Sequence, residues 1–132
     1  MKLRLITTVL FSAFLLTACG LLPNSAKISS TELNNAITNG ATTMKILDVR
    51  QSEDFDGGHI QGSISLPYDN EHFDQMYQRL DWPTNTVIVV VDSYEFRALD
   101  ASKKLQSSGF TEVKTLEGGF EGWKTQNYQI VK

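Results

Sequence analysis

The sequence predicts an α/β fold in which a central, mostly parallel sheet of about five strands carries helices on both faces. Segments with the pattern of strands alternate with segments of helical periodicity along the chain, which is the order that βαβ units require. Residues 86–91 (TVIVVV) lack the alternation of polar and apolar side chains, as expected of a central parallel strand covered on both faces. The 132 residues leave room for one domain with an ordinary hydrophobic core.

The first helix and the first strand are expected in the N-terminal half of this domain. A serine and a glutamate spaced as in a capping box open the helix expected over residues 29–39. Residues 44–49 (MKILDV) then form a short, buried strand. The next stretch, residues 51–67, is polar and contains several glycines, so only a brief strand around residues 63–66 is expected within it.

The C-terminal half continues the alternation of helices and strands. A helix is expected over residues 71–80, with its apolar side chains on one face, and Pro83 ends it. After the central strand, a helix over residues 96–108 and a strand over residues 112–116 follow. The last segment opens with two glycines and holds a short helix around residues 120–123.

The N-terminus has the layout of a secretory signal: a basic start, an apolar run and small residues before Cys19. The run is too short for a comfortable bilayer span of about 20 residues. Residues 16–19 (LTAC) resemble the lipobox of bacterial lipoproteins, which implies that Cys19 is lipidated and becomes the first mature residue. We therefore expect a signal peptide over residues 1–18, a lipidated cysteine with a tether over residues 19–27, and one domain over residues 28–132. Plain secretion and an uncleaved anchor are the alternatives.

The residue after Cys19 predicts the membrane to which the protein is attached. In the sorting pattern of Gram-negative lipoproteins, an aspartate at this position implies retention at the inner membrane, and here the residue is Gly20. The resemblance thus implies a cell-envelope lipoprotein on the outer membrane, facing the periplasm, rather than on the inner membrane. Several acyl chains such as palmitate, at about 0.8 kcal/mol per buried methylene, make such an anchor stable.

Cysteine count and charge exclude several classes of function. Cys19 is the only cysteine, so once it is lipidated the domain has no thiol for a disulfide, a thiolate–metal site or a persulfide. Without the signal, ten basic side chains face fifteen acidic ones, which gives no footprint for nucleic acid or for anionic lipid headgroups. Two isolated histidines offer no metal-ligand spacing. We expect a monomer without a metal ion or another cofactor.

Four motifs, in order and between the expected elements, resemble the rhodanese family. The resemblance covers nearly the whole domain and implies a rhodanese-like three-layer sandwich. Three of the motifs frame the sheet: Leu47-Asp48-Val49-Arg50; Gly58-His59-Ile60-Gln61-Gly62-Ser63-Ile64 followed by Leu66-Pro67; and Gly109-Phe110 with Leu116-Glu117-Gly118-Gly119 and Trp123. By the same resemblance Asp48 and Arg50 are structural, with paired charges, and His59 forms a structural hydrogen bond rather than acting as a base.

The fourth motif lies after the central strand and departs from the family pattern. The family loop runs from a cysteine over four residues to an arginine, and its backbone amides converge on the cysteine sulfur at a helix N-terminus. The corresponding pocket loop here is Asp92, Ser93, Tyr94, Glu95, Phe96 and Arg97. The resemblance therefore puts Asp92 at the nucleophile position, keeps Arg97, and places Glu95 where a glycine is common.

A carboxylate cannot replace the thiolate, because persulfide transfer needs a sulfur nucleophile that accepts and releases a sulfane sulfur. We hypothesise that Asp92 fills the cradle, accepts loop amides and pairs with Arg97, whereas a contact between Arg97 and a bound anion is the alternative. Glu95 adds negative charge that disfavours thiosulfate or phosphate. No catalytic residue is expected. For Tyr94 and Phe96, an exposed rim that contacts a partner or a ligand is the alternative to a purely structural role in the loop.

Two functions follow from this interpretation. The first is a non-catalytic rhodanese-like module, tethered to the envelope, that binds or regulates an envelope protein. The second is an enzyme of the same family with a non-cysteine mechanism, either thiosulfate sulfurtransferase-like or phosphatase-like through an aspartyl phosphate on Asp92. Phosphatases that resemble this fold have a loop one residue longer and still use cysteine, so the first function is favoured.

Overall fold

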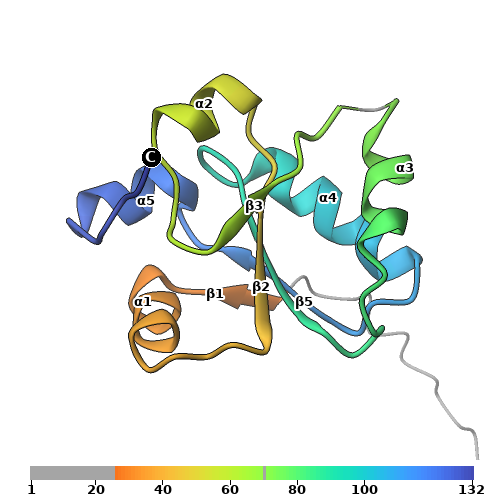
Figure 1. Ribbon diagram of the computed structural model, residues 1–132, viewed down its shortest axis with the longest axis horizontal. Helices are drawn as coiled ribbons and strands as arrows, with labels where there is room; N and C mark the ends of the chain where they lie inside the picture. Colours follow the sequence, from red (N-terminus) through yellow and green to blue (C-terminus); the bar gives the residue numbers. More distant parts are fainter. Residues whose placement is uncertain (1–25, 70) are drawn as a thin grey trace, which may run out of the picture.

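The computed structural model describes residues 26–69 and 71–132 and contains one parallel sheet (Figure 1). Its five strands run in the order β1-β5-β4-β2-β3. They are β1 (Ala26–Ile28), β2 (Met44–Asp48), β3 (Ser63–Ser65), β4 (Val87–Val91) and β5 (Glu112–Leu116). The apolar run expected to be central is β4, which pairs with β2 on one side and β5 on the other. The expected α/β fold is confirmed.

Helices cover both faces of this sheet (Figure 1). They are α1 (Ser30–Thr38), α2 (Ser52–Gly57), α3 (Phe73–Tyr77), which continues as the 3-10 turn η1 (Gln78–Leu80), α4 (Phe96–Ser107) and α5 (Gly119–Thr125). Helices α3 and α4 pack on one face, and α1 and α5 pack on the other. No helix in the part of the chain that the structure describes is long and apolar enough to cross a membrane.

Strand β4 divides the hydrophobic core into two halves. Ile88 and Val90 pack beneath α3 and α4, whereas Val89 and Val91 point to the opposite face and pack beneath α1 and α5. All four side chains are fully buried. Alternate side chains of a strand point to opposite faces, so only a strand covered twice needs apolar residues at every position.

Two elements differ from the sequence-based expectation. Residues 52–57 form helix α2 in the stretch where only a brief strand was expected, because this helix is polar and buries none of its side chains. Such a helix has no apolar periodicity to reveal it. Strand β1 begins inside the segment taken for a tether: Ala26 and Lys27 pair with Lys114 and Thr115 of β5. The expected signal peptide, the lipidation of Cys19 and the remainder of the tether lie outside the described residues.

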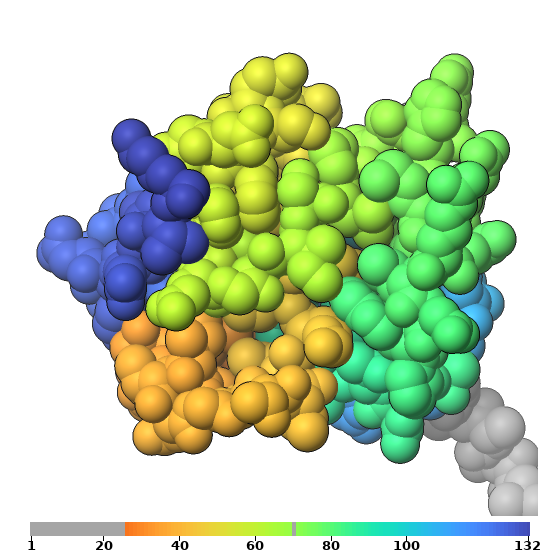
Figure 2. Space-filling view, viewed as in Figure 1, coloured from red at the N-terminus to blue at the C-terminus, as the bar shows by residue number. Residues whose placement is uncertain are grey.

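The C-terminal residues return to the segment around α2. His59 and Val131 form an antiparallel bridge, in which each backbone N–H donates to the other residue's carbonyl at 2.9 Å. The Trp123 indole N–H donates to the Gln129 carbonyl and holds the start of this segment on α5. In the space-filling view the dark blue C-terminal segment lies against the yellow-green residues that follow α2 (Figure 2). The C-terminal segment thus links α5 to the residues that follow α2.

Candidate functional site

The carboxyl ends of the parallel strands bring the expected pocket loop together with α2 and α5. Residues 92–95 connect β4 to α4, and Phe96 and Arg97 are the first two residues of α4; α2 follows β2, and α5 follows β5. In open parallel sheets, binding crevices lie outside these carboxyl ends. The topology therefore places the loop at the position where a ligand site is expected.

The backbone of α5 holds the first half of the loop. The Phe120 N–H donates to the Asp92 carbonyl at 2.8 Å, and the Glu121 N–H donates to the Ser93 carbonyl at 2.9 Å. Gly119 has a φ of +60°, and a Cβ atom at this position would lie 1.9 Å from the Tyr94 carbonyl oxygen. Only glycine permits this approach, so the second glycine of the closing motif lets α5 bind the loop.

Asp92 lies at the base of the loop and is only 4% exposed. Its Oδ2 accepts one loop amide, the Arg97 N–H, at 3.2 Å. Its Oδ1 lies 3.5 Å from Arg97 Nε, within ion-pair range, but accepts no hydrogen bond from the described residues. Asp92 therefore pairs with Arg97 as expected, but a single amide contacts it instead of the converging set that was expected.

Glu95 turns away from Asp92 and joins three segments. Its Oε1 accepts a hydrogen bond from the Gly118 N–H, and its Oε2 accepts one from Lys27 Nζ, each at 2.7 Å. The Gly118 N–H and then Lys27 hold the pKa of Glu95 below its usual value, while Glu95 raises the pKa of Lys27. The charge of Glu95 is thus compensated by Lys27, which corrects the expectation that it adds negative charge to the site.

The two aromatic side chains of the loop are exposed, whereas Ser93 is not. Tyr94 is 62% exposed and Phe96 is 79% exposed, although Phe96 is the first residue of α4. Ser93 is partly buried and lines a cavity of about 320 Å³. Both aromatic rings are thus exposed to solvent, as expected, but neither lines this cavity.

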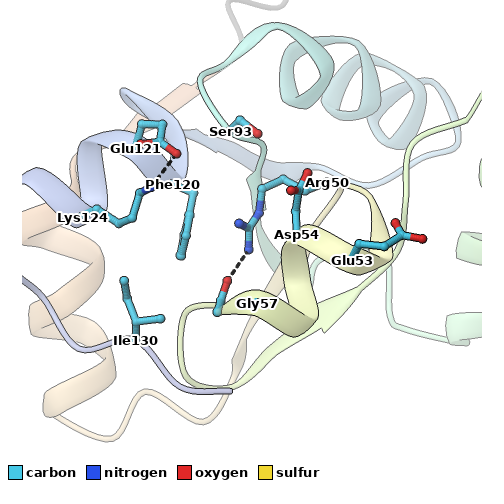
Figure 3. A pocket seen from close by; sticks show the side chains of 10 residues that line it. Arg50, Glu53, Asp54, Gly57, Ser93, Phe120, Glu121, Lys124 and Ile130 are labelled. Atoms are coloured by element: carbon cyan, nitrogen blue, oxygen red, sulfur yellow. Dashed lines mark hydrogen bonds and ion pairs between the residues drawn. The ribbon is translucent and has the colours of Figure 1, made fainter.

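The cavity lies between α2, α5 and the C-terminal segment (Figure 3). Arg50 lies between these elements and is buried. It donates to both oxygens of Asp48, with the shortest contact at 2.6 Å, and to the Gly58 carbonyl at 2.8 Å. Its guanidinium carbon is 3.8 Å from the centre of the Phe120 ring. The expected pairing of Asp48 with Arg50 is confirmed, and it fixes the base of the cavity.

The two histidines do not take part in this cavity. His59 Nδ1 lies 3.0 Å from the Phe55 carbonyl oxygen, and the two rings stack at 3.8 Å. His72 is exposed beside Asp69 at the start of α3. Across residues 26–69 and 71–132, no three histidine, cysteine, aspartate or glutamate side chains come together in a way that would hold a metal ion.

Comparison with known proteins identifies the family. Residues 29–126 match the family model of the rhodanese-like domain. The chain belongs to the rhodanese-like domain family. Its first matched residue precedes α1 and its last follows α5, so the match spans nearly the whole described domain.

Relatives of this rhodanese-like domain include proteins with and without a described activity. An uncharacterized Bacillus subtilis protein, YqhL, is 27% identical over 121 residues, which cover 91% of this chain and 92% of the relative. The thiosulfate sulfurtransferase GlpE of Shewanella oneidensis is 31% identical over 87 residues, which cover 66% of this chain and 82% of the relative. Among solved structures, BH2092 of Bacillus halodurans has a TM-score of 0.71 at 28% identity. The superposition covers 81% of this chain and 77% of the BH2092 chain.

The place of several residues in the site of this rhodanese-like domain could not be predicted from the sequence. Lys27 was assigned to the tether, yet it reaches Glu95 because β1 adds to the edge of the sheet. Glu53 and Asp54 line the cavity from α2, a helix that was not expected. Gly119 was noted as part of a motif, but its contact with the loop follows only from the structure.

Proposed function

We propose that this chain is a lipid-anchored rhodanese-like domain of the cell envelope that binds or regulates a partner and does not transfer sulfur. The observation that supports this proposal is the buried carboxylate of Asp92 at the base of the loop after β4. The resemblance of the loop to the family motif supports the proposal, because it implies that Asp92 stands at the position of the sulfur-carrying cysteine. The loop that surrounds a nucleophile in the family then surrounds a carboxylate that already has a charge partner, Arg97.

The chemistry of sulfur transfer is the reason for assigning no catalysis. A sulfane sulfur is carried as a persulfide, which forms when a thiolate attacks a sulfur donor. The sequence has one cysteine, Cys19, which precedes the domain. A carboxylate oxygen at Asp92 has no comparable route to a transferable sulfur, so turnover of thiosulfate by the family mechanism is not expected.

The proposed anchor rests on the N-terminal sequence. The signal-like run, the LTAC sequence that ends at Cys19, and the absence of an aspartate at residue 20 favour an outer-membrane lipoprotein that faces the periplasm. Secretion without lipid, or attachment to the inner membrane, is the alternative. The acidic balance of the mature chain makes a polybasic contact with lipid headgroups an unsuitable mode of attachment.

A thiosulfate-to-cyanide sulfur transfer assay tests the proposal. The full chain, purified in a non-ionic detergent, is compared with an Asp92→Cys variant and with a Ser93→Cys variant as the matched control. We expect no turnover by the wild-type chain, and turnover by Asp92→Cys but not by Ser93→Cys, because only the first substitution puts a thiol at the base of the loop.

The same assay separates this proposal from the second candidate, a sulfurtransferase-like or phosphatase-like enzyme without a cysteine nucleophile. The relationship to GlpE, a thiosulfate sulfurtransferase, favours that candidate. Thiosulfate turnover by the wild-type chain that survives Cys19→Ser would overturn the non-catalytic proposal. Release of phosphate from p-nitrophenyl phosphate that is lost in Asp92→Asn would do the same, because a carboxylate nucleophile would then be required.

A further inference from the structure

We infer that the cavity between α2, α5 and the C-terminal segment is a binding site for an uncharged sugar ring. The observation that carries this inference is a nitrogen atom of the buried Arg50 side chain that has no hydrogen-bond acceptor among the described residues and opens on the cavity. The inference goes beyond the proposed function. It does not depend on the absence of sulfur transfer, because Asp92 is not among the residues that line the cavity.

The side chain of Arg50 is only 5% exposed, and protein partners occupy two of its three nitrogen atoms. Nε and Nη2 donate to the Asp48 carboxylate, and Nη2 also donates to the Gly58 carbonyl oxygen. Nη1 donates to no residue of the ranges 26–69 and 71–132. The fully buried polar side-chain atoms without a partner in those ranges are Asp92 Oδ1 and Gln106 Oε1, so Nη1 keeps contact with solvent. Because Arg50 lines the cavity, Nη1 opens on it, and Figure 3 shows the guanidinium among the lining residues, between α2 and α5.

Hydrogen-bond acceptors without a partner line the same cavity. Asp54 lines it from α2, and its carboxylate forms no hydrogen bond or ion pair within the described residues. Ser93 adds a hydroxyl from the loop after β4, which likewise has no partner in the part of the chain that the structure describes. A guanidinium can only donate hydrogen bonds, and a carboxylate can only accept them. A ligand that satisfies both groups within one small cavity therefore needs acceptors and donors close together.

The charges around the cavity disfavour an ionic ligand. Both cationic side chains that line it already have a carboxylate partner, Asp48 for Arg50 and Glu121 for Lys124. The carboxylates that α2 contributes are left over, so an anion placed against Nη1 would be repelled by them. A cation could pair with these carboxylates but could not accept a hydrogen bond from Nη1. An uncharged ligand satisfies both conditions.

Hydroxyl groups have the required combination of functions. A hydroxyl donates one hydrogen bond and has two acceptor lone pairs, so neighbouring hydroxyls accept from Arg50 Nη1 and donate to Asp54 without adding charge. A primary carboxamide offers one acceptor atom and one donor atom, which leaves the Ser93 hydroxyl without a partner. Only two lining side chains, Phe120 and Ile130, are apolar, whereas most ligand pockets are predominantly apolar. The volume of about 320 Å³ is near the lower end of the roughly 300–1,000 Å³ range of such pockets, which favours a single ring.

An NMR titration of the full chain tests this site. The chain is kept in a polyoxyethylene detergent, which has no sugar head group, and the probes are the methyl glycosides of glucose, galactose and mannose, which differ in the orientation of their hydroxyls. We expect at least one glycoside to shift the side-chain N–H signals of Arg50 and the backbone signals of Gly57 and Gly58, with a Kd of about 1 mM. Glucuronate and propionamide should bind at least about fivefold more weakly, because the first adds a negative charge and the second has too few polar groups.

Matched substitutions on α2 localise the site. Asp54→Ala should weaken the best-bound glycoside by roughly fivefold, because one charge-assisted hydrogen bond is lost. Asp56→Ala removes the same charge from an exposed position of the same helix that does not line the cavity, so it should change the affinity by less than about twofold. Arg50→Lys would also remove the fork that binds Asp48 and could prevent folding. The Arg50 signals of the wild-type chain therefore report on Nη1 without that variant.

Each result either supports or overturns the site. The absence of shifts with all three glycosides overturns it, and so do shifts that leave the Arg50 side-chain signals unchanged. Equal effects of Asp54→Ala and Asp56→Ala overturn it as well, because the cavity would then not be the place of binding. Glucuronate or propionamide that binds as tightly as the best glycoside overturns the class of ligand. Turnover of thiosulfate that survives Cys19→Ser overturns the proposed function alone, whatever the result of the glycoside titration.

Discussion

At the scale of single residues, the site is defined by how each carboxylate is satisfied. Asp92 has one hydrogen-bonded oxygen and one oxygen that relies on Arg97 Nε at 3.5 Å. Both contacts come from Arg97, one from its backbone and one from its side chain. A buried carboxylate is costly unless it is paired, so Arg97 makes it possible for Asp92 to occupy the base of the loop.

Replacement of Glu95 by glutamine tests the contact between the loop, α5 and β1. The substitution keeps an acceptor for the Gly118 N–H but removes the charge that Lys27 binds. We expect a loss of at most about 1 kcal/mol in the free energy of unfolding at neutral pH, because Lys27 is half-exposed and solvent screens the ion pair. Urea denaturation of both chains measures it.

The pH dependence of that loss gives a second, independent readout. The folded-state pKa of Glu95 is lowered by the Gly118 N–H and Lys27, so its contribution is present above the unfolded-state value and is lost as the pH falls through the folded pKa. The difference between wild type and Glu95→Gln should therefore shrink on acidification below about pH 4.5. A difference that stays constant from pH 7 to pH 3 contradicts the contact. Glu53→Gln, which removes no ion pair within the described residues, is the matched control.

At the scale of elements, the loop and the N-terminus of α5 form one unit. The substitution Gly119→Ala would place a Cβ atom 1.9 Å from the Tyr94 carbonyl oxygen and 2.6 Å from the Asp92 carbonyl oxygen, at a φ of +60°. We expect a destabilisation of about 3 kcal/mol or more, because both the left-handed conformation and the backbone contact are unfavourable for alanine. Thermal unfolding monitored by circular dichroism measures this loss.

A second glycine provides the control for that prediction. Gly57, at the end of α2, has an ordinary φ, and a Cβ atom there would meet nothing within 4 Å. Gly57→Ala should leave the stability unchanged or raise it slightly, because alanine has the better helix propensity. Equal effects of the two substitutions would show that α5 does not hold the loop as described.

Most elements could be predicted from the sequence, because the spacing of their apolar side chains indicates which face is buried. The strand over residues 112–116 was predicted to the residue, and α1 begins at the expected capping box of Ser29 and Glu32. The polar helix α2 and the three-residue strand β1 were missed. Neither element has enough buried side chains to show a periodic pattern of apolar residues. Strand β1 depends on its pairing with β5.

The site was harder to predict than the fold, for a related reason. The loop itself was located from the sequence, because it directly follows the strongly apolar β4 and runs into the helix after it. The partner of Glu95 was not, because Lys27 is 68 residues away in the chain and reaches the loop through the pairing of β1 with β5. Contacts that depend on the packing of separate elements leave no local pattern.

At the scale of the whole molecule, the single cysteine precedes the rhodanese-like domain in the sequence. The loop, α2 and α5 gather at the carboxyl edge of the sheet, whereas Cys19 precedes the first strand by several residues. The matched domain, residues 29–126, contains no cysteine and therefore no thiol.

Substitution of Cys19 tests the proposed lipid anchor in the whole protein. Cys19→Ser should abolish the incorporation of labelled palmitate. The chain should then either appear in the soluble fraction or accumulate with its signal peptide uncleaved, because the acyl chains supply most of the membrane affinity. Gly20→Asp should retain the lipid but shift the protein from the outer to the inner membrane on a sucrose gradient, as the lipoprotein sorting pattern implies. Palmitate labelling that persists in Cys19→Ser contradicts the assignment of the lipid to this residue. A Gly20→Asp chain that stays in the outer membrane contradicts only the sorting, so the two substitutions test attachment and destination separately.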